Sequence, residues 1–299
     1  MSKHQVVDIS SFKYEHIPYN GFIEFLGKRG SGKTSWVRYM LTQLIDRQEG
    51  TFIVMAGSER VKDLWADMVP RLFVVDPSLE YLEKLKQHQT QMVKHYKHSD
   101  FPRVHHITLI LDDCASIKTF MRSPILAWLA SNGRHIELRI CILVQYLNQC
   151  PCEIRDQFDI IFCLATSNRK NIAKLHEEYV GVGEFRTFRS VLNTMTEDRG
   201  CLVIDNRINS SSISGCCFYS KIENFPIVPI HIGDERQWSY SEKHYIENIQ
   251  TYVPHQLQQD VVEESDEEED LEEIKKVMDT TRMYSDRLGK IIIRKTGQA

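Results

Sequence analysis

The stretch "EFLGKRGSGKTSW", residues 24–36, decides the fold of this chain. It contains the pattern G-x-x-x-x-G-K-[ST] without a mismatch, formed by Gly27, Gly32, Lys33 and Thr34. The apolar run 21–27 predicts a buried strand before the motif, and apolar residues at helical spacing over 34–45 predict a helix after it. A strand, a glycine-rich loop and a helix N-terminus in this order indicate a phosphate-binding loop, or P-loop.

This loop predicts a bound nucleoside triphosphate, because its N–H groups point inward and the helix dipole favours negative charge. The lysine of such a loop bridges the β- and γ-phosphates, and the hydroxyl that follows it holds Mg²⁺. We assign these roles to Lys33 and Thr34, and predict ATP and Mg²⁺ as cofactors. The residues expected around the phosphates are Gly27, Lys28, Arg29, Gly30, Ser31, Gly32, Lys33, Thr34 and Ser35.

A second motif, "ITLILDDCA" at 107–115, has the form of a Walker B element, an apolar strand that ends in acidic residues. Asp112 is expected to hold Mg²⁺, directly or through water, and Asp113 to polarise the attacking water. Two adjacent carboxylates raise each other's pKa, so the charge of the metal is needed to keep both ionised. With the P-loop, or Walker A motif, this element predicts a hydrolytic site.

Polar residues around the next strand extend the predicted site. Gln145 ends the apolar run 138–145, at the strand end where open α/β sheets place their active groups, and its amide could orient the water and sense loss of the γ-phosphate. Arg134 follows a helix-ending glycine, and we expect it at the sheet edge that holds both Walker motifs. Either Arg134 or Arg155, just before the following strand, could reach a neighbouring subunit's γ-phosphate as an arginine finger.

Continuous apolar strands alternate with helices, which predicts an α/β fold: a mostly parallel central sheet covered by helices on both faces. The expected strands are 21–27, 51–57, 72–76, 106–113, 138–145, 159–165, 200–205 and 215–222. The expected helices, besides 34–45, are 77–98, 120–135, 169–181 and 185–195. We divide the chain into a lead-in that could add an edge strand, a P-loop ATPase domain and an acidic, flexible tail: 1–20, 21–255 and 256–299.

The net charge of −4 is unevenly distributed. The tail, 256–299, carries 12 acidic and 7 basic side chains, and "EESDEEEDLEE" at 263–273 has nine acidic residues among eleven, so the rest of the chain is close to neutral. A block of like charges is typical of a solvated or disordered segment. The body lacks the basic footprint of a nucleic-acid-binding domain, although a ring of subunits could still gather basic loops into one pore.

No apolar run approaches the roughly 20 residues of a membrane helix, and the N-terminus has no signal-peptide pattern. The eight cysteines lie mostly in apolar, strand-like runs, as Cys141 and Cys163 do, which is typical of reduced core thiols in a cytosolic protein. "CPC" at 150–152 and the pair Cys216–Cys217 lack the spacing of a four-ligand zinc site.

The order of these motifs over roughly residues 20–205 resembles the FtsK–HerA superfamily of DNA-pumping ATPases. Within it, the chain is most similar to the poxvirus-type packaging ATPases of nucleocytoplasmic large DNA viruses and related virophages. The resemblance rests on "LGKRGSGKTS", "LILDDCA", "NGRHIELRICILVQ" and "CEIRDQFDIIF". Many members carry Asp-Glu in Walker B, where this chain has the shorter Asp113.

The resemblance implies that Lys33, Thr34, Asp112 and Asp113 are the Walker residues, Gln145 is the polar sensor and Arg134 is the arginine proposed to act in trans. It further implies a homo-oligomeric ring that pumps double-stranded DNA into a preformed capsid. The implied partner of that ring is a protein of the capsid vertex or of the inner membrane. The implied location is the host cytoplasm, at the viral factory, and the virion.

Two other functions use the same loop. A nucleoside or nucleotide kinase would need a lid with an arginine cluster, for which "SNRKN" at 167–171 is the only candidate. A regulatory GTPase would need a base-reading Asn-Lys-x-Asp, which the chain lacks. The motifs therefore favour the DNA motor, with the kinase as the alternative.

Overall fold

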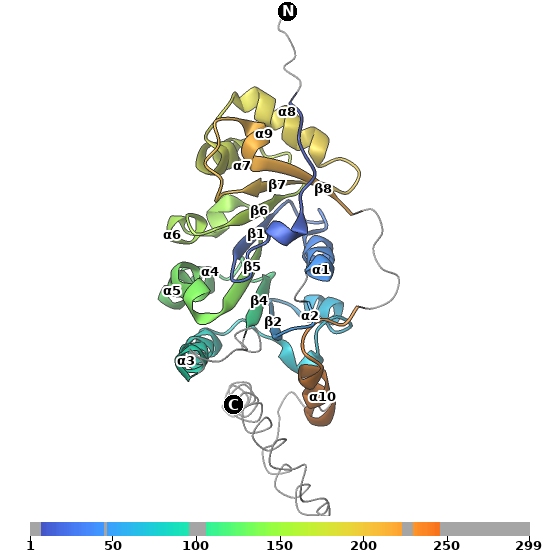
Figure 1. The fold of residues 1–299 in the computed structure, drawn as a ribbon, viewed down its shortest axis with the longest axis vertical. Helices are drawn as coiled ribbons and strands as arrows, with labels where there is room; N and C mark the ends of the chain where they lie inside the picture. Colours follow the sequence, from blue (N-terminus) through green and yellow to red (C-terminus); the bar gives the residue numbers. More distant parts are fainter. Residues whose placement is uncertain (1–6, 45–46, 96–105, 223–229, 246–299) are drawn as a thin grey trace, which may run out of the picture.

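The strands form one eight-stranded sheet in the order β3-β2-β4-β5-β1-β6-β7-β8 (Figure 1). This computed structural model describes residues 7–44, 47–95, 106–222 and 230–245. The strands are β1 (Phe22–Leu26), β2 (Thr51–Ala56), β3 (Val74–Val75), β4 (Ile107–Asp112), β5 (Leu138–Val144), β6 (Ile160–Cys163), β7 (Gly200–Asp205) and β8 (Cys217–Lys221).

Six of the strands, β3 to β6 in the spatial order, run parallel to one another, whereas β7 is antiparallel to β6 and β8 is antiparallel to β7. Every residue of β1, β4, β5 and β6 is buried. Strands that are covered on both faces require such continuous apolar sequences. The expected mostly parallel α/β sheet is therefore confirmed.

Helices cover both faces of the sheet (Figure 1): α3, α4, α5 and α6 lie on one side, and α1, α2 and α10 on the other. The helices are α1 (Lys33–Gln43), α2 (Glu59–Trp65), α3 (Leu79–His95), α4 (Lys118–Met121), α5 (Pro124–Asn132), α6 (Cys152–Arg155), α7 (Arg169–Leu175), α8 (Phe185–Met195), α9 (Ile213–Cys216) and α10 (Glu235–His244). None of the helices in the described ranges is both long enough and apolar enough to cross a membrane.

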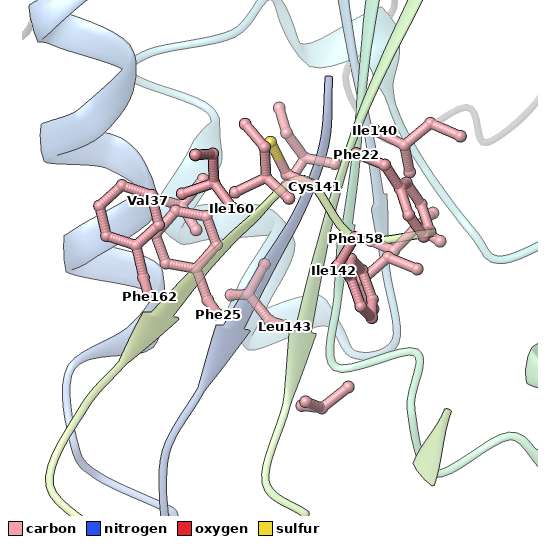
Figure 2. Close-up of a cluster of buried hydrophobic side chains, with 14 of the residues drawn as sticks. Phe22, Phe25, Val37, Ile140, Cys141, Ile142, Leu143, Phe158, Ile160 and Phe162 are labelled. Carbon is pink, nitrogen blue, oxygen red and sulfur yellow. The ribbon is translucent and has the colours of Figure 1, made fainter. Parts of the chain in front are cut away.

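The core contains two aromatic pairs, one between β1 and β6 and one between β1 and the segment before β6 (Figure 2). Phe25 stacks on its parallel neighbour Phe162, with ring centroids 4.6 Å apart, on the α1 side of the sheet next to Val37. Phe22 stacks on Phe158 at 4.4 Å on the other face. These contacts clamp β1 from both faces, and β1 is the strand that leads directly into the P-loop.

Two expected elements differ in the structure. The strand expected over 72–76 is reduced to β3, because a 3-10 turn occupies Arg71–Phe73 after Pro70. The helix expected over 120–135 is divided into α4, α5 and a 3-10 turn at Gly133–Ile136. The break before α5 has a local cause: Pro124 disfavours a helical residue before it, and the Ser123 hydroxyl accepts the N–H of Leu126 as an N-cap.

Segments at both ends of the described chain attach to the sheet. Ser11 makes an isolated parallel bridge with Tyr219 of β8. After the last strand, Gln237 of α10 accepts the N–H of Phe52 and donates to its carbonyl, at 3.2 and 2.7 Å, so a side chain completes the backbone pairing of β2 where β3 is too short to do so. The division into 1–20, 21–255 and 256–299 stays a proposal, and the tail lies outside the described residues.

Candidate nucleotide-binding site

The P-loop connects β1 to α1, as its sequence predicts. Gly32 occupies the N-cap of α1 with φ 86° and ψ 24°, a left-handed conformation that strains any residue with a side chain. The N–H of Gly27 donates to the carbonyl of Val144 at 3.1 Å, which ties the start of the loop to the end of β5. A loop that ends at a helix N-terminus is an arrangement suited to bind an anion, and the contacts of residues 27–35 with phosphate stay a prediction.

Lys33 lies folded over this loop. Its Nζ donates to the carbonyl oxygens of Gly27 and Lys28, at 2.9 and 3.2 Å. Burial lowers the pKa of Lys33, while the carboxylates of Asp112 and Asp113 oppose that shift. The ammonium group is therefore held at the mouth of the loop, where a phosphate would be bound.

The two predicted metal-binding residues meet in the structure although 78 positions separate them. The hydroxyl of Thr34 donates to Oδ2 of Asp112 at 2.8 Å. Burial raises the pKa of Asp112, and hydrogen bonds from Thr34 and the Trp65 indole oppose the shift. A hydroxyl and a carboxylate next to a phosphate site are the hard oxygen ligands that Mg²⁺ prefers, so this pair fits the metal.

Asp113 has a different environment from its neighbour. It is exposed and has φ 57°, in the left-handed region that aspartate tolerates better than most residues. Gly57, directly after β2, lies against it: a Cβ there would come 2.2 Å from the carbonyl oxygen of Asp113. The N–H of Gly57 also donates to the carbonyl of Asp112 at 3.0 Å. The Walker B backbone is therefore held from the side by β2.

Gln145 follows β5, which lies between β4 and β1 and hence between the two Walker strands. Gln145 is half-exposed. Its backbone N–H donates to Oε1 of Gln149 at 2.6 Å. The same oxygen accepts the N–H of Tyr146 at 3.0 Å. Gln149 thus shapes the loop that carries the predicted sensor.

The expected position of Arg134 is wrong. This arginine lies in the turn before β5, and β5 runs parallel to β1, so it is at the amino edge of the sheet. The P-loop and the Walker B aspartates follow the carboxyl ends of their strands. Arg134 is exposed, and its carbonyl accepts a hydrogen bond from Asn20 at 3.3 Å. A residue that precedes a parallel strand cannot share an edge with residues that follow one; its role in trans stays a prediction.

Arg155, the alternative finger, is engaged within its own subunit. It forms a bidentate pair with Glu178, at 2.8 and 3.0 Å, and donates to the carbonyl of Cys150 at 2.6 Å. The residue is only 9% exposed. These contacts weigh against Arg155 as a residue that reaches a neighbouring active site.

Three residues of the site were not anticipated from the sequence: Gly57, Trp65 and Gln149. The indole N–H of Trp65 donates to Oδ2 of Asp112 at 3.1 Å, across 47 positions. No local pattern marks this tryptophan; Gly57 could have been noticed as a glycine that directly follows a buried strand. All eight cysteines are free thiols, seven of them buried, and the described ranges hold no cluster of three His, Cys, Asp or Glu side chains suited to a metal.

Comparisons with known proteins agree with the motif order. A family model described as Poxvirus A32 protein matches residues 9–225. Protein 075L of Invertebrate iridescent virus 6 is 29% identical over 187 residues, which cover 62% of this chain and 70% of that protein. Protein L437 of Acanthamoeba polyphaga mimivirus is 28% identical over 220 residues, which cover 72% of this chain and 77% of that protein.

Among solved structures, the genome packaging NTPase B204 from Sulfolobus turreted icosahedral virus 2, in complex with ATP-gammaS, aligns with a TM-score of 0.49 and 15% identity, over 68% of this chain and 98% of that chain. The pCW3 conjugation coupling protein TcpA aligns with a TM-score of 0.47 and 13% identity, over 73% and 70%. The family assignment rests on the family model, which matches well over half of the chain and confirms the resemblance seen in the motifs. This chain belongs to the Poxvirus A32 protein family, a family of viral packaging ATPases.

Proposed function

We propose that the protein hydrolyses ATP in order to move double-stranded viral DNA into a preformed capsid. The observation that carries this proposal is the 2.8 Å hydrogen bond between Thr34 and Asp112, which brings Walker A and Walker B together beside Lys33. Family membership supports the packaging role. The coupling of hydrolysis to DNA movement, the ring of subunits and a capsid or inner-membrane partner belong to the proposal, as does action in the host cytoplasm and the virion.

Each residue has a role that follows from its position. Backbone N–H groups of the P-loop bind the β- and γ-phosphates, and Lys33 exchanges its two carbonyl contacts for phosphate oxygens. Thr34 and Asp112 would hold Mg²⁺, which would supply positive charge beside the phosphate oxygens. Asp113, exposed beside them, accepts a proton from the attacking water, and Gln145 orients that water.

The kinase alternative loses its lid candidate. Within "SNRKN", Asn168 caps α7 by accepting the N–H groups of Lys170 and Asn171, at 3.0 and 3.2 Å. Arg169 is the first residue of that helix. The segment is thus a helix start built into the fold. The DNA motor remains the better reading of the site.

The deciding experiment measures ATP hydrolysis with and without double-stranded DNA, over a range of protein concentrations. The motor should be stimulated by DNA, and its specific activity should rise with protein concentration because subunits must assemble. Asp112→Asn is the control for contaminating ATPases. It removes a predicted metal ligand, and it is assayed with the same DNA as the wild-type protein. Phosphate transfer to a nucleoside or nucleotide, with no response to DNA, would reject the motor in favour of the kinase.

A further inference from the structure

Residues 57–67, which we call the β2–α2 corner, contact both the Walker B aspartates and the helix that follows the P-loop. Gly57 lies against the backbone of Asp113, as described above. Beyond the helix, Asp67 accepts two hydrogen bonds from Arg38 of α1, at 2.8 and 2.9 Å. Trp65, the last residue of α2, lies between Gly57 and Asp67 in the sequence and donates a hydrogen bond to Asp112. This corner, which belongs to neither Walker motif, joins the P-loop helix to the Walker B strand.

Trp65 is the part of the corner that reaches a predicted metal ligand. It has no exposed surface, and Asp112 is 5% exposed, so their hydrogen bond is formed in a buried environment. Oδ2 of Asp112 accepts from both Trp65 and Thr34, at 3.1 and 2.8 Å. Two donors on one oxygen fix the rotation of the carboxylate about its χ2 bond. Oδ1 accepts no hydrogen bond from the described residues and is left to bind other groups.

We propose that Trp65 is a positioning residue that orients Asp112 for Mg²⁺. This inference rests on the proposed ATPase function. An indole N–H is a donor only and cannot ligate a cation, so Trp65 acts through the carboxylate it holds. Outer groups that hydrogen-bond a metal ligand commonly change metal affinity by roughly 10–100-fold when they are removed. Without the indole N–H, Oδ2 of Asp112 would be held by the hydroxyl of Thr34 alone.

The test is the equilibrium binding of a fluorescent ATP analogue as Mg²⁺ is titrated, which requires no turnover. Trp65→Phe keeps an aromatic ring but removes the N–H. We expect nucleotide affinity without metal to stay within about twofold of the wild-type value, and the half-saturating Mg²⁺ concentration to rise roughly 10–100-fold. Nucleotide affinity without metal measures whether the P-loop is intact. Comparing it with the half-saturating Mg²⁺ concentration therefore separates a loss of metal positioning from general damage to the site.

Trp238→Phe is the matched control. The indole of Trp238 also donates one hydrogen bond, to the carbonyl of Ile232 at 2.9 Å, but it does so beside α10 and away from the P-loop. Its loss should leave the Mg²⁺ titration unchanged. If Trp65→Phe fails to fold, benzothienylalanine at position 65 replaces the N–H by sulfur at nearly the same shape, and the same titration applies.

The outcomes separate this inference from the proposed function. An unchanged Mg²⁺ titration in folded Trp65→Phe, together with a weakened one in Asp112→Asn, overturns the role of Trp65 alone. If Asp112→Asn also leaves the titration unchanged, the metal site itself is misassigned. An equal loss of affinity with and without Mg²⁺ in Trp65→Phe assigns the tryptophan a structural role and overturns the positioning role.

Discussion

The carboxyl and amino edges of the same sheet carry different kinds of polar residue. At the carboxyl edge, the P-loop, the Walker B aspartates and Gln145 come from three adjacent parallel strands and are available to a nucleotide. At the amino edge, Asp159 and Asn20 are engaged with the protein itself, whereas Arg134 is exposed. Oδ2 of Asp159 accepts the N–H of Phe22 at 2.8 Å, and Asn20 donates to Glu137 at 3.0 Å.

The difference follows from the direction of the parallel strands. Residues that follow these strands lie at the carboxyl edge, and residues that precede them lie at the amino edge. At the amino edge, Asn20, Arg134 and Asp159 line a small hollow together with neighbouring residues of β1, α5 and β5. Because Arg134 lies at the edge opposite to the P-loop of its own subunit, a catalytic role on the nucleotide of another subunit stays a prediction.

Lys33→Ala should have the largest effect on ATP turnover, because it removes the ammonium group expected to bind the transferring phosphate at the carboxyl edge of the sheet. We expect ATP turnover to fall by at least about 10³-fold. The unfolding temperature should change little, because the hydrogen bonds of the Lys33 Nζ to the described residues go to two loop carbonyls and not to the core. Both are measured on the same preparation, by phosphate release and by thermal denaturation. Hydrolysis at the wild-type rate by the folded variant would refute the P-loop assignment.

Arg134→Ala tests whether the amino edge acts across a subunit interface. We expect nucleotide binding to be retained and turnover to fall by about 10³-fold, the lower end of the range for arginine fingers. Arg186→Ala removes an exposed arginine from α8 and serves as the matched control. The measurement is ATPase activity in the assembled state.

Mixing Arg134→Ala with Lys33→Ala distinguishes action in trans from action in cis. A Lys33→Ala subunit still has Arg134, and an Arg134→Ala subunit still has its P-loop, so one complete site forms where they meet in the right order. Partial activity should return on mixing. If mixed assemblies form and activity does not return, Arg134 has no role on the neighbouring nucleotide.

Asp113→Asn separates the two Walker B carboxylates. Asp113 is exposed whereas Asp112 is buried, so we expect Mg²⁺-dependent nucleotide binding to persist and kcat to fall by roughly 10²-fold. Single-turnover hydrolysis together with equilibrium binding measures both quantities. Normal hydrolysis would move the water-activating role to another group, with Gln145 the first to examine.

Glu24→Gln probes the interior between the two edges. Glu24 of β1 is fully buried, and burial raises its pKa to about 8 against the opposing effects of Arg155 and Tyr179. The folded chain thus binds a proton that the unfolded chain releases from about pH 4.5 upward, so the free energy of unfolding falls as pH rises toward 8. The slope from this group is at most about 1.4 kcal/mol per pH unit.

Urea unfolding of wild type and Glu24→Gln at several pH values between 5 and 8 measures this contribution. We expect the variant to lose most of the downward slope, since glutamine does not titrate. Parallel slopes would show that Glu24 is ionised in the folded protein, paired with Arg155.

The parts of the site that could be predicted are those whose geometry is written in a contiguous segment. The P-loop is a turn closed by residues a few positions apart, and Asp112 and Gln145 are marked by the ends of apolar strands. A parallel sheet then brings strand ends to one edge, which is why Thr34 and Asp112 could be expected to meet. Arg134 precedes its parallel strand instead of following it, and it therefore lies at the opposite edge of the sheet.

Tertiary structure alone decided which side chains surround those strand ends. The bond from Trp65 to Asp112 spans 47 positions, and the position of Gly57 against Asp113 depends on how β2 is aligned with β4. The pairing of Arg155 with Glu178, which engages one of the two candidate fingers, likewise needs α6 to lie beside the turn after α7. Local spacing determines a motif because neighbouring residues share a backbone path; contacts between distant segments depend on the register and packing of the whole sheet.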